Sequence, residues 1–567
     1  MLKPQTLLGV FAFFLLTRSS AQDVLWRNHF WSKNYYWGML NTVDPAGNLY
    51  ASAYIGGPAE IDTVLDNHLT NPGKGQYIYK VDSTGKAVWA KMALSGVGSI
   101  RVNALHTDQA GSVYLAGFFT GSVDFDPGPG TQIFNTLVSQ MYFIQKLDPD
   151  GNLVWARQIN THNANGTANV TGLDADGNLV ITGNFQGVTD FDPGPGEYNL
   201  TGQPAGSEFL LKLTGDGDFI WVKQFEKVGV ILASHLDADG NWIFRGSVYQ
   251  PSDLDPGPDT FMMNAGYFFL KLDSDGGFIW ARLFDQDVEG YDTDASGNLV
   301  IIGEFEDTVD FDPGPGEVWR TAPFGQGNYV TKWNKHGEFQ WVNLEPKTQN
   351  AGVASQTVEI APDGGILLAG PYLGTFDIDP GPAPHFISTG SGDLGYVLQA
   401  LDATGKFIWE RHIAYVTVIT VENEYFLQCD NQGNLYARTT FREDIFFTID
   451  SSNITHLFAY KPPLELEHLV FKMQLPGSSA TDAQDLPENE FDLFPNPVPA
   501  YTPATLLLPD SPSAVEIVVR DMQGLLVKRL EWTTGSSRQD LPGLPSGLYV
   551  VEVRTARSAE VKLLSVF

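Results

Sequence analysis

The chain has 567 residues, more than one ordinary core accommodates, so several domains or a repeat architecture is expected. Its formal net charge of −33 disfavours nucleic acid and anionic membranes as partners, because like charges repel. A single cysteine, Cys429, excludes an intramolecular disulfide. Aromatic residues make up 12% of the chain and there are 58 glycines, a composition typical of short strands joined by tight turns. We therefore expect an all-β protein.

The first 21 residues have the pattern of a secretion signal. Lys3 supplies a positive charge, residues 7–16 form an apolar run, and residues 19–21 are small, as at a cleavage site. The apolar run is shorter than the roughly 20 residues that span a bilayer. The sequence thus predicts export of the mature chain and no transmembrane segment.

Residues 23–475 contain seven copies of one unit. Each copy contains an Asp-x-x-Gly-Asn-like turn between its first two strands, and the glycines of these turns are spaced by 57 to 69 residues: Gly47, Gly111, Gly177, Gly240, Gly297, Gly364 and Gly433. A second turn, typified by Lys-Leu-Asp-x-x-Gly, leads into a strand that carries a tryptophan in six copies: Trp89, Trp155, Trp221, Trp280, Trp341 and Trp409. Self-similarity at a fixed period indicates a repeat fold.

Each copy reads as a four-stranded sheet, and radial packing of such sheets gives a β-propeller. The seventh copy has three strands, the last around Phe471, and then lacks the tryptophan strand. Residues 24–27, Val-Leu-Trp-Arg, resemble the missing segment. We therefore predict a seven-bladed β-propeller in which the N-terminal strand around Trp26 closes the last blade and removes open sheet edges. The repeats resemble those of bacterial propeller-repeat proteins, a likeness that is specific for fold and says little about ligand.

Five copies contain the motif Asp-x-Asp-Pro-Gly-Pro. The paired acidic residues are Asp124 and Asp126, Asp190 and Asp192, Asp253 and Asp255, Asp310 and Asp312, and Asp377 and Asp379. In an extended segment the two carboxylates face one way and the intervening apolar residue faces the core. One hypothesis is a Ca²⁺ site in each blade, built from oxygen ligands. The alternative, which we favour, is that each aspartate accepts bonds from backbone N–H groups and fixes a turn.

The segment after each motif links the second and third strands and is the longest and most variable link of the unit. In propellers these links share a face with the channel entrance, where we expect ligands to bind. The candidate contact residues are the aromatic side chains in these links: Phe134, Tyr198, Phe261, Trp319 and Phe386. They either stack on a glycan or grip a protein, or they alternate into a short accessory strand and are half buried.

A polar linker is expected at residues 476–490, and residues 491–567 form a separate β module, expected to be a small sandwich. The module contains Pro-Asn-Pro, a central Asp-x-x-Gly hairpin, Leu-x-x-Gly-Leu-Tyr and a terminal Lys-Leu-Leu strand, in this order. This combination resembles the type A sorting domain of the type IX secretion system. The resemblance implies recognition by the secretion machinery, and secretion or attachment to the outer surface of a Gram-negative bacterium.

Three functions are compatible with these features. We rank first a secreted or cell-surface module that binds a glycan or a protein, without enzymatic activity. The alternatives are a hydrolase or lyase acting at the channel mouth, and a structural surface component. The hairpin at residues 275–280 resembles the Asp-box of sialidase-type propellers, but the arginine cluster and nucleophilic tyrosine of that chemistry cannot be identified. Cys429 reads as a small strand residue, and no cofactor beyond Ca²⁺ is suggested.

Overall fold

A computed structural model provides the structure of the chain. It describes residues 24–32, 36–55, 59–63, 69–71, 75–92, 98–136, 140–160, 169–226, 228–237, 239–284, 286–348, 351–379, 385–389, 394–416, 426–430, 432–441, 445–448, 454–457, 467–475, 492–494, 504–507, 515–521, 526–531, 538–541, 543–545, 547–555 and 559–566. Every regular element in these segments is a strand, as predicted. The expected signal segment and the linker at residues 476–490 lie outside the described residues.

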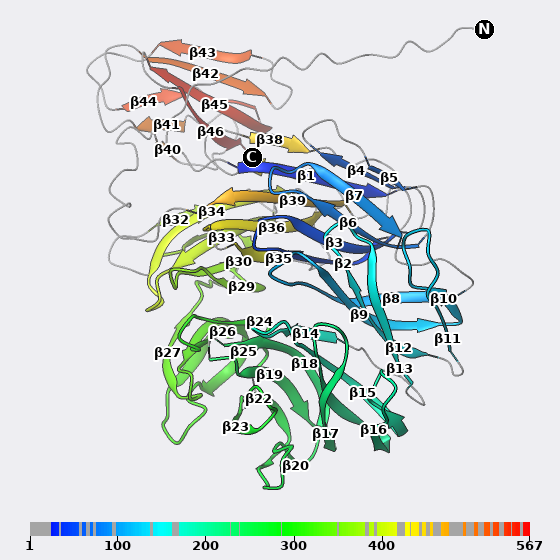
Figure 1. Ribbon diagram of the computed structural model, residues 1–567. Helices are drawn as coiled ribbons and strands as arrows, with labels where there is room; N and C mark the ends of the chain where they lie inside the picture. The colour runs from blue at the N-terminus through cyan, green and yellow to red at the C-terminus, as the bar shows by residue number, and fades with distance from the viewer. Residues whose placement is uncertain are drawn as a thin grey trace, which may run out of the picture.

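Seven four-stranded antiparallel sheets follow one another along the chain and form the predicted propeller (Figure 1). Blade 1 contains β2(Tyr36–Val43), β3(Leu49–Ile55), β6(Gly75–Val81) and β7(Ala87–Met92); blade 2 contains β8(Ser99–Thr107), β9(Val113–Thr120), β12(Met141–Leu147) and β13(Leu153–Ile159). Blade 3 contains β14(Asn169–Leu173), β15(Leu179–Asp190), β16(Asn199–Leu213) and β17(Phe219–Glu226); blade 4 contains β18(Val228–Leu236), β19(Trp242–Val248), β22(Gly266–Leu272) and β23(Phe278–Leu283). Blade 5 contains β24(Gly290–Thr293), β25(Leu299–Asp310), β26(Trp319–Trp333) and β27(Phe339–Leu344). Blade 6 contains β29(Thr357–Ile360), β30(Ile366–Leu373), β33(Leu394–Leu401) and β34(Phe407–Val416), with the short β28(Gly352–Val353) beside β30.

Blade 7 joins the two ends of the repeat region, as predicted. Its strands are β35(Phe426–Cys429), β36(Asn434–Phe441), β39(Glu467–Gln474) and the N-terminal β1(Val24–Ser32). β1 pairs antiparallel with β39, so that Arg27 lies opposite Phe471, and Figure 1 shows the two strands side by side. The Tyr436 hydroxyl donates to the Gly47 carbonyl oxygen at 2.8 Å, which links blade 7 to blade 1. The ring is therefore closed by hydrogen bonds between segments at opposite ends of the repeat region.

The Asp-x-x-Gly turns have the same geometry in successive blades. In blade 3, the Asp174 carboxylate accepts from the backbone N–H groups of Asp176 and Asn178 at 3.0 and 2.8 Å. Gly177 has a φ of +78°, which glycine adopts without steric cost. The aspartate and glycine of the repeat thus encode the hairpin between the first and second strands of the blade.

The tryptophans of the fourth strands connect neighbouring blades. Trp155 in blade 2 donates from Nε1 to the Gly215 carbonyl oxygen of blade 3 at 3.1 Å. A side chain at Gly217, in the same turn, would meet the Trp155 ring at 3.2 Å, so the ring packs directly on the backbone. The same contact joins Trp89 to Gly151 and Trp280 to Gly337. In blades 2 to 6, the turn between the third and fourth strands is therefore the docking point for the tryptophan of the preceding blade.

A buried lysine–aspartate pair supports most of the first turns. The Lys271 ammonium lies 2.5 Å from the Asp237 carboxylate, and their side chains are 3% and 0% exposed. Equivalent pairs join Lys146 to Asp108, Lys212 to Asp174, Lys332 to Asp294 and Lys472 to Asp430. In blade 6 alanine occupies both positions, at Ala361 and Ala400, so neither charge is left without its partner.

The C-terminal module consists of two antiparallel sheets. One contains β40(Asp492–Phe494), β41(Ala504–Leu507) and β44(Arg538–Leu541). The other contains β43(Leu526–Glu531), β42(Val515–Asp521), β45(Gly547–Thr555) and β46(Ala559–Val566), in this order. Ile517 and Val519 on β42 and Val551 on β45 are buried. The module is thus all-β, in agreement with the sequence.

Candidate binding site on the blade arms

The link between the second and third strands of a blade forms a projecting hairpin, which we call the arm. In blades 3 and 5 the second and third strands are long, and the arm is the far end of their hairpin: β15 with β16 in blade 3, and β25 with β26 in blade 5. In blades 2, 4 and 6 it is a separate pair of strands: β10(Ser122–Asp124) with β11(Ile133–Asn135), β20(Ser252–Asp253) with β21(Met262–Met263), and β31(Thr375–Asp377) with β32(Phe386–Ser388). The accessory strand predicted for these links is therefore present.

The arms of blades 1 and 7 pair with the outermost strand of the neighbouring blade. The arm of blade 1, β4(Ala59–Thr63) and β5(Leu69–Asn71), pairs with β1, the outermost strand of blade 7. The arm of blade 7, β37(Ile445–Thr448) and β38(Ile454–Leu457), pairs with β34, the outermost strand of blade 6. These two arms therefore extend the sheet of the neighbouring blade at its outer edge.

The middle residue of each Asp-x-Asp motif anchors its arm. Phe125, Phe191, Leu254, Phe311 and Ile378 are all buried, as the alternation of the motif predicts. Phe311 packs on Tyr329 of its own blade and on Phe284 of blade 4, with ring centroids 5.0 and 6.2 Å apart. Burial of a large apolar side chain stabilises by about 1.5–3 kcal/mol, so these contacts hold the arm in place.

The paired aspartates of the motif fix the turn at the tip of the arm. The first carboxylate, Asp310, accepts from the backbone N–H groups of Asp312 and Val318 at 3.0 and 2.7 Å. The second, Asp312, accepts from the N–H of Gly314 at 2.7 Å. The same bonds recur for Asp124 and Asp126, Asp190 and Asp192, and Asp253 and Asp255; Asp377 accepts from Asp379 and His385. These bonds have the pattern of the turn role, the reading favoured from the sequence.

Calcium binding by these aspartates stays a prediction. Among the described residues, no group of three or more His, Cys, Asp or Glu side chains is placed to hold a metal ion. A pair of carboxylates with backbone carbonyls and water remains a recognised type of Ca²⁺ ligand set. A binding measurement with Ca²⁺ distinguishes the two roles.

The five aromatic candidates occupy three different positions on the arms. Phe134 is partly buried and packs on Phe119 and Phe125, so it belongs to the core of its blade. Tyr198 and Phe261 stack on the first residues of the outer strands, Phe219 and Phe278, with centroids 5.0 and 4.8 Å apart. Trp319 and Phe386 are the most exposed of the five, with 54% and 66% of their surface accessible.

Trp319 and Phe386 share a register position that sequence reasoning missed. Each lies directly opposite the first aspartate of its arm, Asp310 or Asp377. The same position is occupied by Ile133 in blade 2, Asn199 in blade 3 and Met262 in blade 4, and these side chains are also exposed. The cross-strand partner of the motif aspartate is therefore the outward-facing position of every described arm of this type. In the sequence this position can be found by counting forward from the first aspartate of the motif, around the hairpin, to its cross-strand partner.

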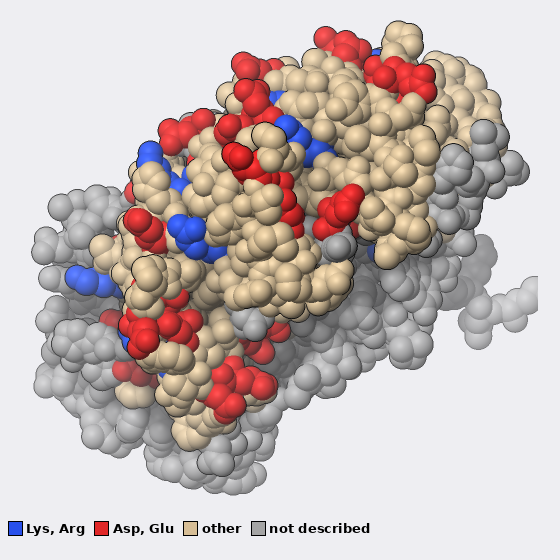
Figure 2. All heavy atoms as spheres, turned by 90° about the horizontal axis from the view of Figure 1, so that it is seen from below, with Lys and Arg blue, Asp and Glu red and all other residues tan. Residues whose placement is uncertain are grey.

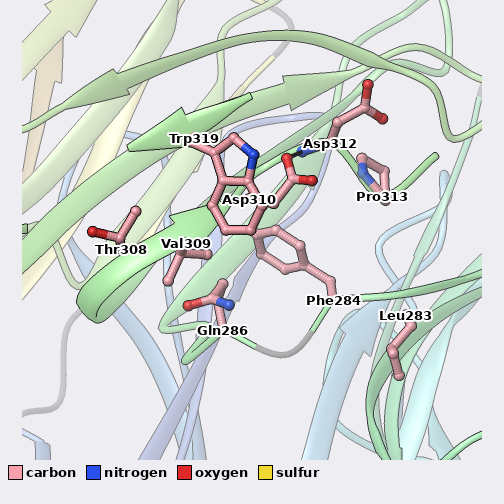
Figure 3. Close-up of a pocket in the computed structure, with 9 residues that line it drawn as sticks. All are labelled: Leu283, Phe284, Gln286, Thr308, Val309, Asp310, Asp312, Pro313 and Trp319. Carbon is pink, nitrogen blue, oxygen red and sulfur yellow. Dashed lines mark hydrogen bonds between the residues drawn. The ribbon is translucent and has the colours of Figure 1, made fainter. Parts of the chain in front are cut away.

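An open depression of about 330 Å³ lies beside Trp319 (Figure 3). One side is formed by Leu283, the last residue of the outer strand of blade 4, and by Phe284 and Gln286 just after it. The other side is the arm of blade 5, and its lining residues are Thr308, Val309, Asp310, Asp312, Pro313 and Trp319. Figure 3 shows the indole at the centre of this set. The end of the outer strand of blade 4 and the arm of blade 5 thus enclose a pocket with an aromatic wall and several polar groups.

The charges of the pocket are negative. Asp310 and Asp312 are its charged lining residues, and Glu317 accepts a bond from Trp319 Nε1 at 3.2 Å. Over the described surface in Figure 2, groups of Asp and Glu are spread among fewer Lys and Arg. A pocket of this kind repels carboxylate and sulfate groups and accepts hydrogen bonds from hydroxyl or amine groups.

Burial raises the pKa of two further side chains of the propeller, Glu345 and Cys429. Burial raises the pKa of Glu345 to about 7, although Ser355 and Gln399 donate hydrogen bonds to it. Burial and the nearby Glu359 raise the pKa of the Cys429 thiol, so the thiol stays protonated and is a poor nucleophile. His235 Nδ1 lies 3.3 Å from the Asp292 carboxylate.

Comparison with known families identifies the C-terminal module. Residues 492–566 match the family described as "Secretion system C-terminal sorting domain". The chain ends in a type IX secretion sorting domain. This domain indicates export to the cell surface or the medium. No helix in the described segments has the length and apolarity needed to cross a bilayer.

Other comparisons give remote likenesses only. No curated protein matches the chain. Among solved structures, PorZ of Porphyromonas gingivalis, described as a surface component of the type-IX secretion system, is 10% identical, with a TM-score of 0.21 over 94% of this chain and 100% of that chain. A fungal alcohol oxidase in complex with copper is 12% identical, with a TM-score of 0.29 over 94% and 99%. A protein of unknown function from Bacteroides caccae is 10% identical, with a TM-score of 0.27 over 59% and 89%. These likenesses do not bear on function.

Proposed function

We propose that the exported propeller is a glycan-binding module, and that Trp319 is the centre of its binding site. The observation that carries the proposal is the position of Trp319: a half-exposed indole standing over an open pocket between two blades. Ligand sites are concave, mostly apolar and supplied with a few convergent polar groups, and a volume of about 300 Å³ lies at the small end of their range. The pocket suits one sugar ring.

The lining chemistry supports a sugar as the ligand. The apolar faces of pyranose rings pack on exposed aromatic side chains, and Trp319 presents such a face. Carboxylate, amide and hydroxyl groups then accept or donate bonds to the sugar hydroxyls, and Asp310, Gln286 and Thr308 supply these groups here. Because the charged lining residues are acidic, a neutral or amine-bearing sugar fits better than a uronic or sialic acid.

The rigidity of the arm also supports binding. Two backbone N–H groups donate to the Asp310 carboxylate, and Phe311 is buried beside it. A preorganised site loses less conformational entropy when the ligand binds. The arm therefore holds Trp319 in place as a fixed platform.

The experiment is a glycan array probed with the purified full chain, followed by calorimetry on the glycans that bind. We expect Trp319→Ala to weaken binding at least tenfold, because the stacking face is lost. Tyr249→Ala is the matched control, since Tyr249 is another exposed aromatic residue that does not line the pocket. If no glycan binds, or if Trp319→Ala binds as tightly as the parent, the proposal is wrong. If the full chain instead binds a protein and Trp319→Ala abolishes that binding, the ligand of this site is a protein and not a glycan.

A further inference from the structure

The arms of blades 5 and 6 carry chemically equivalent sets of four side chains: an aromatic residue, an aspartate and two hydroxyl residues. In blade 5 Trp319 lies opposite Asp310, and two residues along the hairpin Thr321 lies opposite Thr308. In blade 6 Phe386 lies opposite Asp377, and Ser388 lies opposite Thr375. Because opposed residues and residues two apart share a face of a hairpin, each set forms one surface.

The hydroxyl groups of both sets are paired in the same way. The Thr308 and Thr321 hydroxyls are 2.9 Å apart, and the Thr375 and Ser388 hydroxyls are 2.6 Å apart. All four lie in exposed pairs, so they are available to exchange these bonds for bonds to a ligand. An exposed aromatic ring with two adjacent hydroxyls offers a sugar both a stacking face and hydrogen-bonding groups.

The arms of blades 2, 3 and 4, the others whose side chains the structure describes, lack this combination. Blade 2 has Ile133, Ser122 and Asn135 at these positions, and blade 3 has Asn199, Val188 and Thr201. Blade 4 has Met262 opposite the first aspartate of its motif. An exposed aromatic residue and a hydroxyl pair therefore occur together on two adjacent blades of the five.

We propose that the arm of blade 6 is a second glycan subsite, centred on Phe386, and that one oligosaccharide contacts both arms. This inference rests on the proposed function of the Trp319 pocket. The two subsites lie on consecutive blades, so we expect a sufficiently long chain of sugar units bound at the first to reach the second. Linked contacts raise the affinity for a long ligand without improving either contact alone.

The test measures affinity against the chain length of the ligand. Calorimetry with the full chain uses neutral malto-, cello- and manno-oligosaccharides, each from the disaccharide to the octasaccharide. For the parent protein we expect little difference among the shortest members of the series that binds, then a rise of at least tenfold once the oligosaccharide spans both arms. Phe386→Ala is expected to abolish this rise and to leave the affinity for the disaccharide unchanged.

Met262→Ala provides the matched control, because Met262 has the same register position and a similar exposure. It should retain the dependence on chain length. If Phe386→Ala retains the dependence while Trp319→Ala loses binding, the second subsite is wrong and the proposed function stands. If the parent binds none of these series and no other glycan on the array, the proposed function fails and the second subsite with it. All three substituted side chains are exposed, and unchanged melting temperatures would show that the variants remain folded.

Discussion

At the scale of single residues, the buried lysine–aspartate pair is the feature in which blade 6 differs from blades 2 to 5 and 7. Lys271 and Asp237 lie in contact in blade 4 and are almost fully buried, and burial alone would oppose ionisation of the carboxyl. Hydrogen bonds from Lys271 and Asn241 outweigh this effect and hold the pKa of Asp237 below its ordinary value. Blade 6 has lost both members, at Ala361 and Ala400. Losing both avoids the penalty of one unpaired buried charge.

Removal of one member of the pair should therefore lower the free energy of unfolding by more than half of the loss caused by removing both. We expect Lys271→Ala to lower the free energy of unfolding by about 3–5 kcal/mol, because the Asp237 carboxylate stays buried without its partner. The double variant Lys271→Ala with Asp237→Ala should cost less than the sum of the two single variants. Urea denaturation of the four proteins measures this coupling. Lys335→Ala, which breaks an exposed pair with Asp239, is the control and should cost less than about 1 kcal/mol. Strict additivity at Lys271 and Asp237 would contradict the explanation.

Glu345 predicts a dependence of stability on pH. Its carboxyl titrates at about 7 in the folded chain against an ordinary value of 4.5, mainly because it is buried. The folded state thus binds the proton more tightly, so this contribution to stability is complete below pH 4.5 and is lost as the pH rises through 7. Glu345→Gln should match the parent at low pH and exceed its free energy of unfolding by roughly 1–3 kcal/mol above pH 7. The exposed Glu197→Gln should leave the profile unchanged. Parallel profiles for Glu345→Gln and the parent would contradict this role.

At the scale of elements, the arms show both the reach and the limit of the sequence. The alternation in Asp-x-Asp-Pro-Gly-Pro predicted the buried residues, such as Phe125 and Phe191, because a strand period of two needs only local information. The pairing of the arms of blades 1 and 7 with the outer strand of the neighbouring blade could not be predicted, since it depends on how the blades pack on one another. Aromatic character alone grouped Phe134 with Trp319, although one packs in the core and the other faces outward.

The turn role of the aspartates predicts a local effect. Asp310→Ala removes the acceptor of two backbone hydrogen bonds, to Asp312 and Val318, so amide exchange at these two residues should accelerate at least tenfold. Hydrogen exchange followed by mass spectrometry measures it, with the equivalent arm of blade 3, at Asp190, as the internal control. Unchanged exchange in the blade 5 arm would show that the carboxylate does not hold the turn.

The same role gives an expected result for calcium. If the carboxylates serve the backbone, titration with Ca²⁺ after chelation should release no heat and leave the melting temperature unchanged. A ligand that binds only the folded state raises the melting temperature, so stoichiometric heat with such a rise would support calcium sites in the arms instead.

At the scale of the whole molecule, the ring was predictable because it repeats. Seven glycine turns and six tryptophans gave the number of blades, and the absent seventh tryptophan strand pointed to Trp26. Each blade buries its faces against its neighbours, as Trp155 does on the turn containing Gly217, so sequence similarity between copies implies similar packing. The pocket at Trp319 was less accessible to prediction, since it is formed by two blades and depends on how the arm of blade 5 packs beside the end of the outer strand of blade 4.

Closure of the ring by β1 is tested most directly by a crosslink between its two ends. Asn28 and Val470 lie opposite each other in the β1–β39 pair, and opposed residues of antiparallel strands have Cα atoms about 4.5–5.5 Å apart, within the range of a disulfide. In a chain with Cys429→Ala, the variant Asn28→Cys with Val470→Cys should oxidise to one intramolecular disulfide, detected by mass spectrometry after digestion, and its melting temperature should rise. Two thiols that stay reduced under oxidising conditions, in a variant that folds, would contradict closure by the N-terminal strand.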